Sequence, residues 1–216
     1  MSMDSVNTNA TYRFDYKAPC NNAYINPVIL KLCQTHGVQR ILDLGCGNGS
    51  LCRELVDAGF QVSGVEPSRD GIAAARRLVP QSTFYEMSVY DVPGCMPECR
   101  FDAVVSTEVI EHLFRPRALP LFAGAKLRAG GILMVSTPYH GFLKNLAISL
   151  MNGWDSHHTP LWDGGHIKFW SRNSLTQLLH SCGFEVLGFH GVGRLPFFWK
   201  SMILVARQLQ EVIDAV

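Results

Sequence analysis

The chain has 216 residues, of which 47% are hydrophobic and 17% are charged, a composition typical of a folded globular domain. The 19 Lys and Arg side chains nearly balance the 18 Asp and Glu side chains, so charge gives no reason to expect a nucleic acid or an anionic membrane as partner. No apolar run reaches the roughly 20 residues that span a bilayer, and the polar start lacks a signal-peptide core. A cytoplasmic protein is therefore expected, with its oligomeric state left open.

Predicted helices and strands alternate along the chain, after an N-terminal arm and helix in residues 1–36, of which 1–20 form the polar and aromatic arm. Helices are expected at 24–36, 50–59, 70–80, 109–116, within 117–131 and at 171–183. Strands are expected at 40–45, 60–66, 82–88, 101–108, 132–138, 184–193 and 200–208. This alternation predicts one α/β domain over 1–216, a doubly wound, seven-stranded, mostly parallel sheet covered on both faces. The last two strands have no helix between them, so they should form an antiparallel hairpin at one edge.

The stretch ILDLGCGNGSL (41–51) is typical of a buried strand, a glycine-rich turn and the start of a helix. The glycines permit a tight turn whose backbone N–H groups approach a ligand closely. Many nucleotide-binding folds share this pattern, but two details distinguish this one. Ser50 stands where the dinucleotide fingerprint has its third glycine, and Asp43 lies two residues before Gly45. A carboxylate there would repel a pyrophosphate and would suit a ligand that carries an ammonium group.

Further acids follow the next two strands. Glu66 comes about twenty residues after the first glycine, where a carboxylate binds the hydroxyls of a ribose. Asp91 follows the third strand, in a position to meet an adenine amino group. An adenosine with an unphosphorylated ribose and a cationic amino-acid tail is S-adenosylmethionine, which is the expected cofactor. The alternative is that Asp43 and Glu66 only cap helices.

DLGCGNG, GVEPS and FDAVVSTEVIEHL resemble three motifs of the class I S-adenosylmethionine-dependent methyltransferases, and the resemblance covers roughly 38–207. It implies a Rossmann-like methyltransferase fold in which Asp43 and the glycine loop line the methionine end of the cofactor. By the same resemblance, Glu66 holds the ribose and Pro67 or Val89 covers the adenine. The implied cofactor site is Asp43, Gly45, Cys46, Gly47, Glu66, Pro67, Ser88, Val89, Asp91 and Thr107.

The motif STEVIEHL places Glu108, Glu111 and His112 just past the fourth strand, and a helix starting there would bring them to one face. Such a set can bind Mg²⁺, Mn²⁺ or Zn²⁺, although acids also favour the first turn of a helix through its dipole. STPYHGFLKN and GGHIKFWSRNSL resemble two metal-dependent branches of the superfamily, the ubiquinone-biosynthesis O-methyltransferases and the terminal 2′-O-methyltransferases of small RNAs. That resemblance adds His166 to the metal site.

Residues 138–170 are interpreted as a lid inserted over the substrate. Its aromatic side chains could wall an apolar pocket that excludes water, and they are Trp154, Trp162, Phe169 and Trp170. The apolar residues of FLKNLAISLM recur on one helical face, which is expected to face the core or the lid, with peripheral membrane contact left open. His140, His157 and His158 are interpreted as lid or core histidines with satisfied hydrogen bonds.

The expected reaction moves a methyl group from the sulfonium to an oxygen of a small, partly apolar or aromatic hydroxy compound. A metal, His112 or His166 would activate that oxygen. A 2′-hydroxyl of RNA is the alternative acceptor, which the net charge of +1 disfavours. A non-catalytic S-adenosylmethionine-binding protein is a third hypothesis, and a dinucleotide oxidoreductase, which Asp43 and Ser50 disfavour, is a fourth. The sequence names neither the acceptor molecule nor the acceptor atom, which could be oxygen, nitrogen or carbon.

Overall fold

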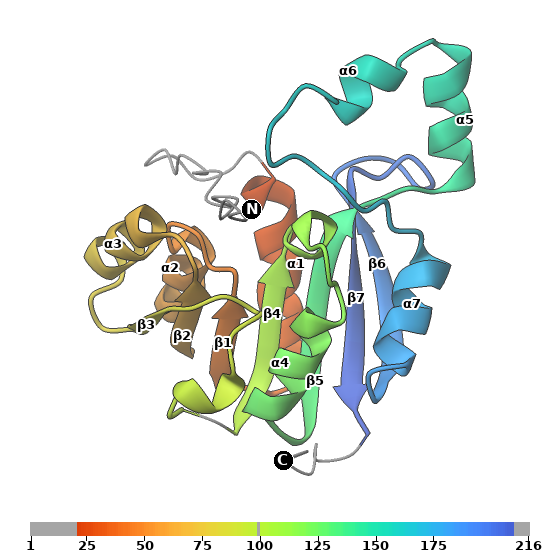
Figure 1. The fold of residues 1–216 in the computed structure, drawn as a ribbon. Helices are drawn as coiled ribbons and strands as arrows, with labels where there is room; N and C mark the ends of the chain where they lie inside the picture. Colours follow the sequence, from red (N-terminus) through yellow and green to blue (C-terminus); the bar gives the residue numbers. More distant parts are fainter. Residues whose placement is uncertain (1–20, 99, 210–216) are drawn as a thin grey trace, which may run out of the picture.

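The computed structural model describes residues 21–98 and 100–209, and these residues build one sheet with helices on both faces (Figure 1). The strands are β1 (Arg40–Leu44), β2 (Gln61–Glu66), β3 (Thr83–Glu86), β4 (Phe101–Thr107), β5 (Leu127–Pro138), β6 (Phe184–Val192) and β7 (Ser201–Gln208). Their order is β3-β2-β1-β4-β5-β7-β6, with β7 antiparallel to both β5 and β6 and all other pairs parallel. The mostly parallel sheet with an antiparallel edge pair is therefore confirmed.

Helices cover the two faces of the sheet in separate groups. They are α1 (Asn22–Thr35), α2 (Ser50–Asp57), α3 (Arg69–Leu78), α4 (Ala118–Lys126), α5 (Phe142–Leu150), α6 (Trp154–His158) and α7 (Arg172–His180), with 3-10 turns η1 (Pro93–Cys95) and η2 (Ile110–His112). Successive strand residues point to opposite faces, so Ile41 packs with α1, α2 and α3, whereas Leu42 packs with α4 and α7. The arm expected in residues 1–20 lies outside the described residues.

The carboxyl ends of the parallel strands meet at one edge of the sheet, and the strand order reverses there. β1 pairs with β2 on one side and with β4 on the other. In open α/β sheets, ligands bind in the crevice outside this edge at the point of reversal. The loops after β1, β2, β4 and β5 are thus the ones that can carry a functional site.

The helix expected at 109–116 is wrong, because this segment forms only the 3-10 turn η2. An α-helix would need the N–H of Arg115 to donate to the carbonyl of Glu111. That carbonyl instead accepts the N–H groups of Ile167 and Lys168, each at 3.0 Å, and the N–H of Arg115 donates to the Tyr90 hydroxyl at 3.3 Å. Tertiary hydrogen bonds therefore replace the helical one.

The segment between β5 and α7 carries α5 and α6, which stand above the end of the sheet (Figure 1). The expectation that the apolar face of α5 points to the core or the lid is wrong. Phe142 and Leu150 are each 78% exposed, while the buried residues of this helix are Lys144 and Ile148. Within the described ranges, no helix combines the length and the apolar character that crossing a bilayer requires.

Candidate active site

The turn after β1 is held so close to its neighbours that two positions require glycine. Gly45 has φ +88°, and a Cβ there would lie 2.5 Å from Val109 Cγ2. Gly49 has φ +81°, and its Cβ would lie 3.0 Å from the Cα of Ala75. The N–H of Gly45 donates to the Val65 carbonyl at 2.8 Å, which ties the turn to β2. The predicted glycine loop is therefore a rigid cradle at the point where the sheet order reverses.

Asp43 is a buried acid with unused hydrogen-bonding capacity. It is 1% exposed, its Oδ2 accepts a hydrogen bond from the Cys52 thiol at 3.2 Å, and its Oδ1 is buried without a partner in the described structure. Burial raises the pKa of Asp43 to about 7. Asp43 does not cap α2, whose N-cap is Gly49. A cationic group in the crevice would supply the partner that the protein does not, as the ammonium of S-adenosylmethionine would.

Glu66, at the end of β2, joins the glycine loop to the next helix. Its Oε2 accepts the N–H of Gly47 at 3.1 Å, and its Oε1 accepts the N–H of Ser68 at 2.9 Å. Ser68 is itself the N-cap of α3, since its hydroxyl accepts the N–H of Gly71, so Glu66 is not the cap residue. Burial raises the pKa of Glu66. Each carboxylate oxygen keeps a second lone pair that can accept a ribose hydroxyl.

The remaining residues of the implied cofactor site lie along the same edge of the sheet. The Asp91 carboxylate accepts the N–H of Ser88 at 2.8 Å and closes the turn after β3. Val89 in that turn is buried, whereas Pro67 is exposed after β2. Thr107 is the last residue of β4. Their contacts with adenine and ribose stay predictions, as does that of Cys46.

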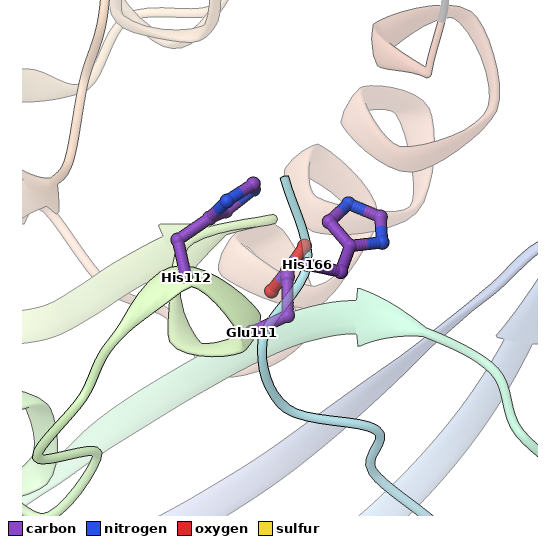
Figure 2. Close-up of side chains that lie close together, drawn as sticks. All are labelled: Glu111, His112 and His166. Atoms are coloured by element: carbon purple, nitrogen blue, oxygen red, sulfur yellow. The ribbon is translucent and has the colours of Figure 1, made fainter. Parts of the chain in front are cut away.

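Three of the four residues of the implied metal site come together (Figure 2). Glu111, His112 and His166 each offer a ligand atom, and these atoms lie within 4.8 Å of one another. The two imidazole rings have centroids 4.9 Å apart. The hydrogen bonds from Ile167 and Lys168 to the Glu111 carbonyl hold the end of the lid against η2, and this brings His166 to the cluster.

A cation would compete with a proton for the Glu111 carboxylate, beside two imidazoles that are neutral. Neither carboxylate oxygen of Glu111 makes a hydrogen bond of good geometry within the described residues. Burial together with the nearby Glu108 raises the pKa of Glu111 well above its usual value, and weaker interactions with its own backbone N–H and the Thr137 hydroxyl oppose this rise. His112 Nδ1 lies 2.9 Å from the Gly164 carbonyl oxygen. A carbonyl only accepts, so Nδ1 carries the proton and Nε2 keeps its lone pair. Burial lowers the pKa of His112, and it lowers that of His166 to about 4.

Glu108 does not belong to this three-residue group. It has φ +54°, and its carboxylate accepts hydrogen bonds from the hydroxyls of Ser136 at 2.8 Å and Ser201 at 3.2 Å. Because η2 is a 3-10 turn, the shared helical face expected for Glu108 and the other two residues does not form. Burial raises the pKa of Glu108 to about 7. A role for Glu108 as a metal ligand stays a prediction.

Aromatic rings of the lid lie beside the same cluster. Trp162 meets His112 and His166 edge-on, with centroids 5.9 and 5.7 Å away. The rings of His140 and His158 are nearly parallel, and their centroids are 5.7 Å apart. The expectation that the lid histidines are fully hydrogen-bonded is wrong for His158, whose Nε2 is buried without a partner in the described part of the chain.

Sequence reasoning missed the one buried cation of the lid. Lys144 on α5 is 5% exposed, and its Nζ donates to the Tyr139 carbonyl at 2.8 Å. The available signal was a lysine placed four residues before Ile148 in a helix whose other residues are mostly apolar. Spacing alone could not show that this pair, and not the apolar stripe, faces inward.

A family model described as a methyltransferase domain matches residues 17–188. The ubiquinone biosynthesis O-methyltransferase of Rhodopseudomonas palustris (strain BisB18) is 33% identical over 148 residues, which cover 66% of this chain and 56% of that protein. The magnesium protoporphyrin IX methyltransferase from Synechocystis PCC 6803 with bound SAH has a TM-score of 0.65 at 18% identity, covering 85% of this chain and 81% of that one. The [4+2]-cyclase SpnF has a TM-score of 0.65 at 17% identity, covering 91% and 85%.

A doubly wound sheet with this glycine loop and a carboxylate near the end of each of two neighbouring strands is the arrangement expected of the class of S-adenosylmethionine-dependent methyltransferases. The family match spans most of the chain, and the chain therefore belongs to the methyltransferase domain family. The chain aligns with little more than half of the ubiquinone biosynthesis enzyme. The two structural likenesses lie below 25% identity and show the fold alone.

Proposed function

We propose that this protein is an S-adenosylmethionine-dependent O-methyltransferase for a small, partly apolar or aromatic hydroxy compound, and that it uses a divalent metal ion. The observation that carries the proposal is the Glu111 carboxylate, which is fully buried with both oxygens unpaired beside two neutral imidazoles. The name of the curated relative from Rhodopseudomonas palustris, an O-methyltransferase, supports oxygen as the acceptor atom.

The chain's own residues would mainly bind and orient the two reactants. Asp43 would pair with the ammonium of the cofactor through its free Oδ1, and Glu66 would accept the ribose hydroxyls. The methyl group of a sulfonium is already activated, so the remaining tasks are alignment with the acceptor oxygen and exclusion of water. Trp162, whose ring meets those of His112 and His166, would help to exclude water from the metal cluster.

Glu111, His112 and His166 are the residues that would hold the ion. An unpaired buried carboxylate is unfavourable unless a cation or a proton neutralises it. His112 is oriented for a metal by the hydrogen bond from Nδ1 to the Gly164 carbonyl, as metal-bound histidines usually are. Such an ion would lower the pKa of an acceptor hydroxyl, and two adjacent hydroxyls could both bind it. Without an ion, His166 is the candidate base.

The test measures metal content and turnover together. The purified protein, treated with chelator and then titrated with Mg²⁺, Mn²⁺ or Zn²⁺, is assayed with a catechol and with a matched monophenol. We expect about one ion per chain in the wild type, loss of turnover in chelator, and recovery on add-back. His166→Ala should lose both the ion and the activity, while His180→Ala, which changes an exposed histidine of α7, should lose neither.

Two results would contradict separate parts of the proposal. Full turnover in chelator by both the wild type and His166→Ala would refute the metal requirement. Glu111, His112 and His166 would then only pack the lid against the sheet. Methylation of an amine or a carbon acceptor, with no phenol or catechol product, would refute oxygen as the acceptor atom. The assignment as a methyltransferase would still hold.

A further inference from the structure

The carboxylate of Asp43 is directed into an apolar layer of the fold. Along β1, Ile41 and Asp43 point to the same face of the sheet, because alternate strand residues share a face, and Ile41 packs there with α1, α2 and α3. Asp43 pairs in register with Gly64 of β2, and a Cβ at Gly64 would lie 2.7 Å from the Cys46 sulfur. Gly64 therefore leaves room for the Cys46 side chain and brings no polar side chain of its own to Asp43.

A thiol of α2 is the group that reaches this carboxylate. Cys52, in the first turn of the helix, is fully buried, and its Sγ donates to Asp43 Oδ2 at 3.2 Å. Within the described residues the other oxygen, Oδ1, has no hydrogen-bond partner. A thiol is a weak donor without a charge, so it holds one oxygen and leaves the negative charge of the carboxylate uncompensated. A buried acid in this state favours a cation at its free oxygen.

The contact from Cys52 fixes the rotation of the Asp43 carboxylate. The torsion between Cβ and the carboxylate carbon of an aspartate is broad, so the group has little orientation of its own. With Oδ2 held by α2, Oδ1 is the oxygen that remains available to a ligand. Asp43 is the next-to-last residue of β1, two residues before the first glycine of the turn, so the free oxygen belongs to the part of the fold where the cofactor is expected.

We propose that Cys52 is a positioning residue for cofactor binding, whose thiol orients the Asp43 carboxylate so that Oδ1 can pair with the ammonium of S-adenosylmethionine. This rests on the role proposed above for Asp43 and adds a residue that acts through it. The hydrogen bond also favours the ionised carboxylate, since burial raises the pKa of Asp43 to about 7 and the bond from Cys52 opposes that rise. The other ionisable neighbours of Asp43 are Glu66 at the end of β2 and Cys46 in the glycine turn.

Two ligands separate the ammonium from the rest of the cofactor. S-adenosylhomocysteine carries both the adenosine and the amino-acid ammonium, whereas 5′-methylthioadenosine lacks the amino acid. In calorimetric titrations at pH 7, Cys52→Ala should weaken binding of S-adenosylhomocysteine about 5- to 20-fold, as expected for a lost hydrogen bond to a charged group, and leave binding of 5′-methylthioadenosine unchanged. Cys52→Ser keeps a donor and should restore the affinity to within about twofold of the wild type. Cys33→Ala, which removes a buried thiol of α1 from the same core cluster, should change neither.

The pH dependence of binding distinguishes this role from packing. Between pH 6 and 8.5, the weakening caused by Cys52→Ala should be largest at low pH and should shrink as the pH rises. The lost donor raises the pKa of Asp43 further, and only the ionised carboxylate pairs with the ammonium, so the variant recovers affinity where Asp43 is ionised. The ammonium of the ligand, Glu66 and Cys46 are present with the wild type and the variant alike, so the ratio of the two dissociation constants reports on Asp43. Cys33→Ala should give a ratio that does not change with pH.

Asp43→Asn distinguishes failure of this inference from failure of the proposed role of Asp43. If Asp43→Asn weakens binding of S-adenosylhomocysteine and Cys52→Ala does not, the role of Asp43 stands and the positioning role of Cys52 is refuted. If Cys52→Ala weakens both ligands equally at every pH, Cys52 only packs α2 against the sheet, and the inference is refuted as well. If Asp43→Asn binds as tightly as the wild type, the role of Asp43 fails and this inference fails with it. Circular dichroism checks the fold of each variant, and should Cys52→Ala unfold, Cys52→Val, which fills the space without donating, takes its place.

Discussion

Replacing Asp43 with Asn should stabilise the ligand-free protein while it weakens cofactor binding. Burial raises the pKa of Asp43 from 3.8 to about 7, with a smaller contribution from the charge of Glu66. A carboxyl group that holds its proton more tightly in the native state than in the unfolded state contributes stability below its unfolded pKa. That stability is lost as the pH rises through the folded pKa. Asn has no proton to lose, so the variant escapes this penalty.

The size of the effect follows from the shift. One pKa unit corresponds to about 1.36 kcal/mol, so a shift of about three units corresponds to about 4 kcal/mol above pH 7. Relaxation and water entry around a buried charge reduce this, and we expect Asp43→Asn to raise the free energy of unfolding by about 2–3 kcal/mol at pH 8. The difference should shrink as the pH falls and disappear near pH 4. The buried histidines titrate in both proteins and therefore do not affect the difference.

Urea unfolding followed by tryptophan fluorescence at pH 4, 6 and 8 measures the stability, and calorimetry measures S-adenosylmethionine binding. The variant should bind the cofactor about tenfold more weakly or worse, because the ammonium loses its charged partner. Asp57→Asn is the matched control. Asp57 forms an exposed ion pair with Arg53, so its loss should cost about 1 kcal/mol or less and leave binding unchanged. If Asp43→Asn is less stable than the wild type at pH 8, or binds the cofactor with unchanged affinity, the reasoning is refuted.

Other outcomes follow from single contacts. Gly45→Ala should weaken cofactor binding measured by calorimetry, because the added Cβ would lie 2.5 Å from Val109. Gly37→Ala, at a positive φ but in open space, should cost only about 1 kcal/mol of stability and leave cofactor binding unchanged. Equal effects of the two variants on cofactor binding would contradict this. Ser171→Ala should lower the free energy of unfolding by about 1 kcal/mol, since Ser171 caps α7; an unchanged urea midpoint would argue against the cap. Hydrogen exchange in 138–170 should slow when cofactor and acceptor bind, and unchanged exchange would indicate a fixed core.

Residues of the cofactor side could be placed from sequence because their positions follow from local rules. Asp43 is the next-to-last residue of β1 and Glu66 the last residue of β2, and neighbouring parallel strands share one carboxyl edge, so both acids are expected at that edge. The backbone conformation of Glu108 and of the 3-10 turn after it could not be predicted from such local rules. The hydrogen bonds that replace the helix there come from Tyr90 and from the far end of the lid, at sequence separations that no local pattern records.

The sequence by itself determined the alternation of strands and helices, the glycine turn and the acids beside it, because backbone sterics and the period of buried residues act over a few positions. Tertiary structure alone decided which face of α5 is buried. The spacing of its apolar residues predicted that they face inward, yet Phe142 and Leu150 are exposed, whereas Lys144 is buried and its ammonium donates to the Tyr139 carbonyl. Which face of a helix is buried depends on the elements that surround it, and the tertiary structure places neighbours such as α6 against α5.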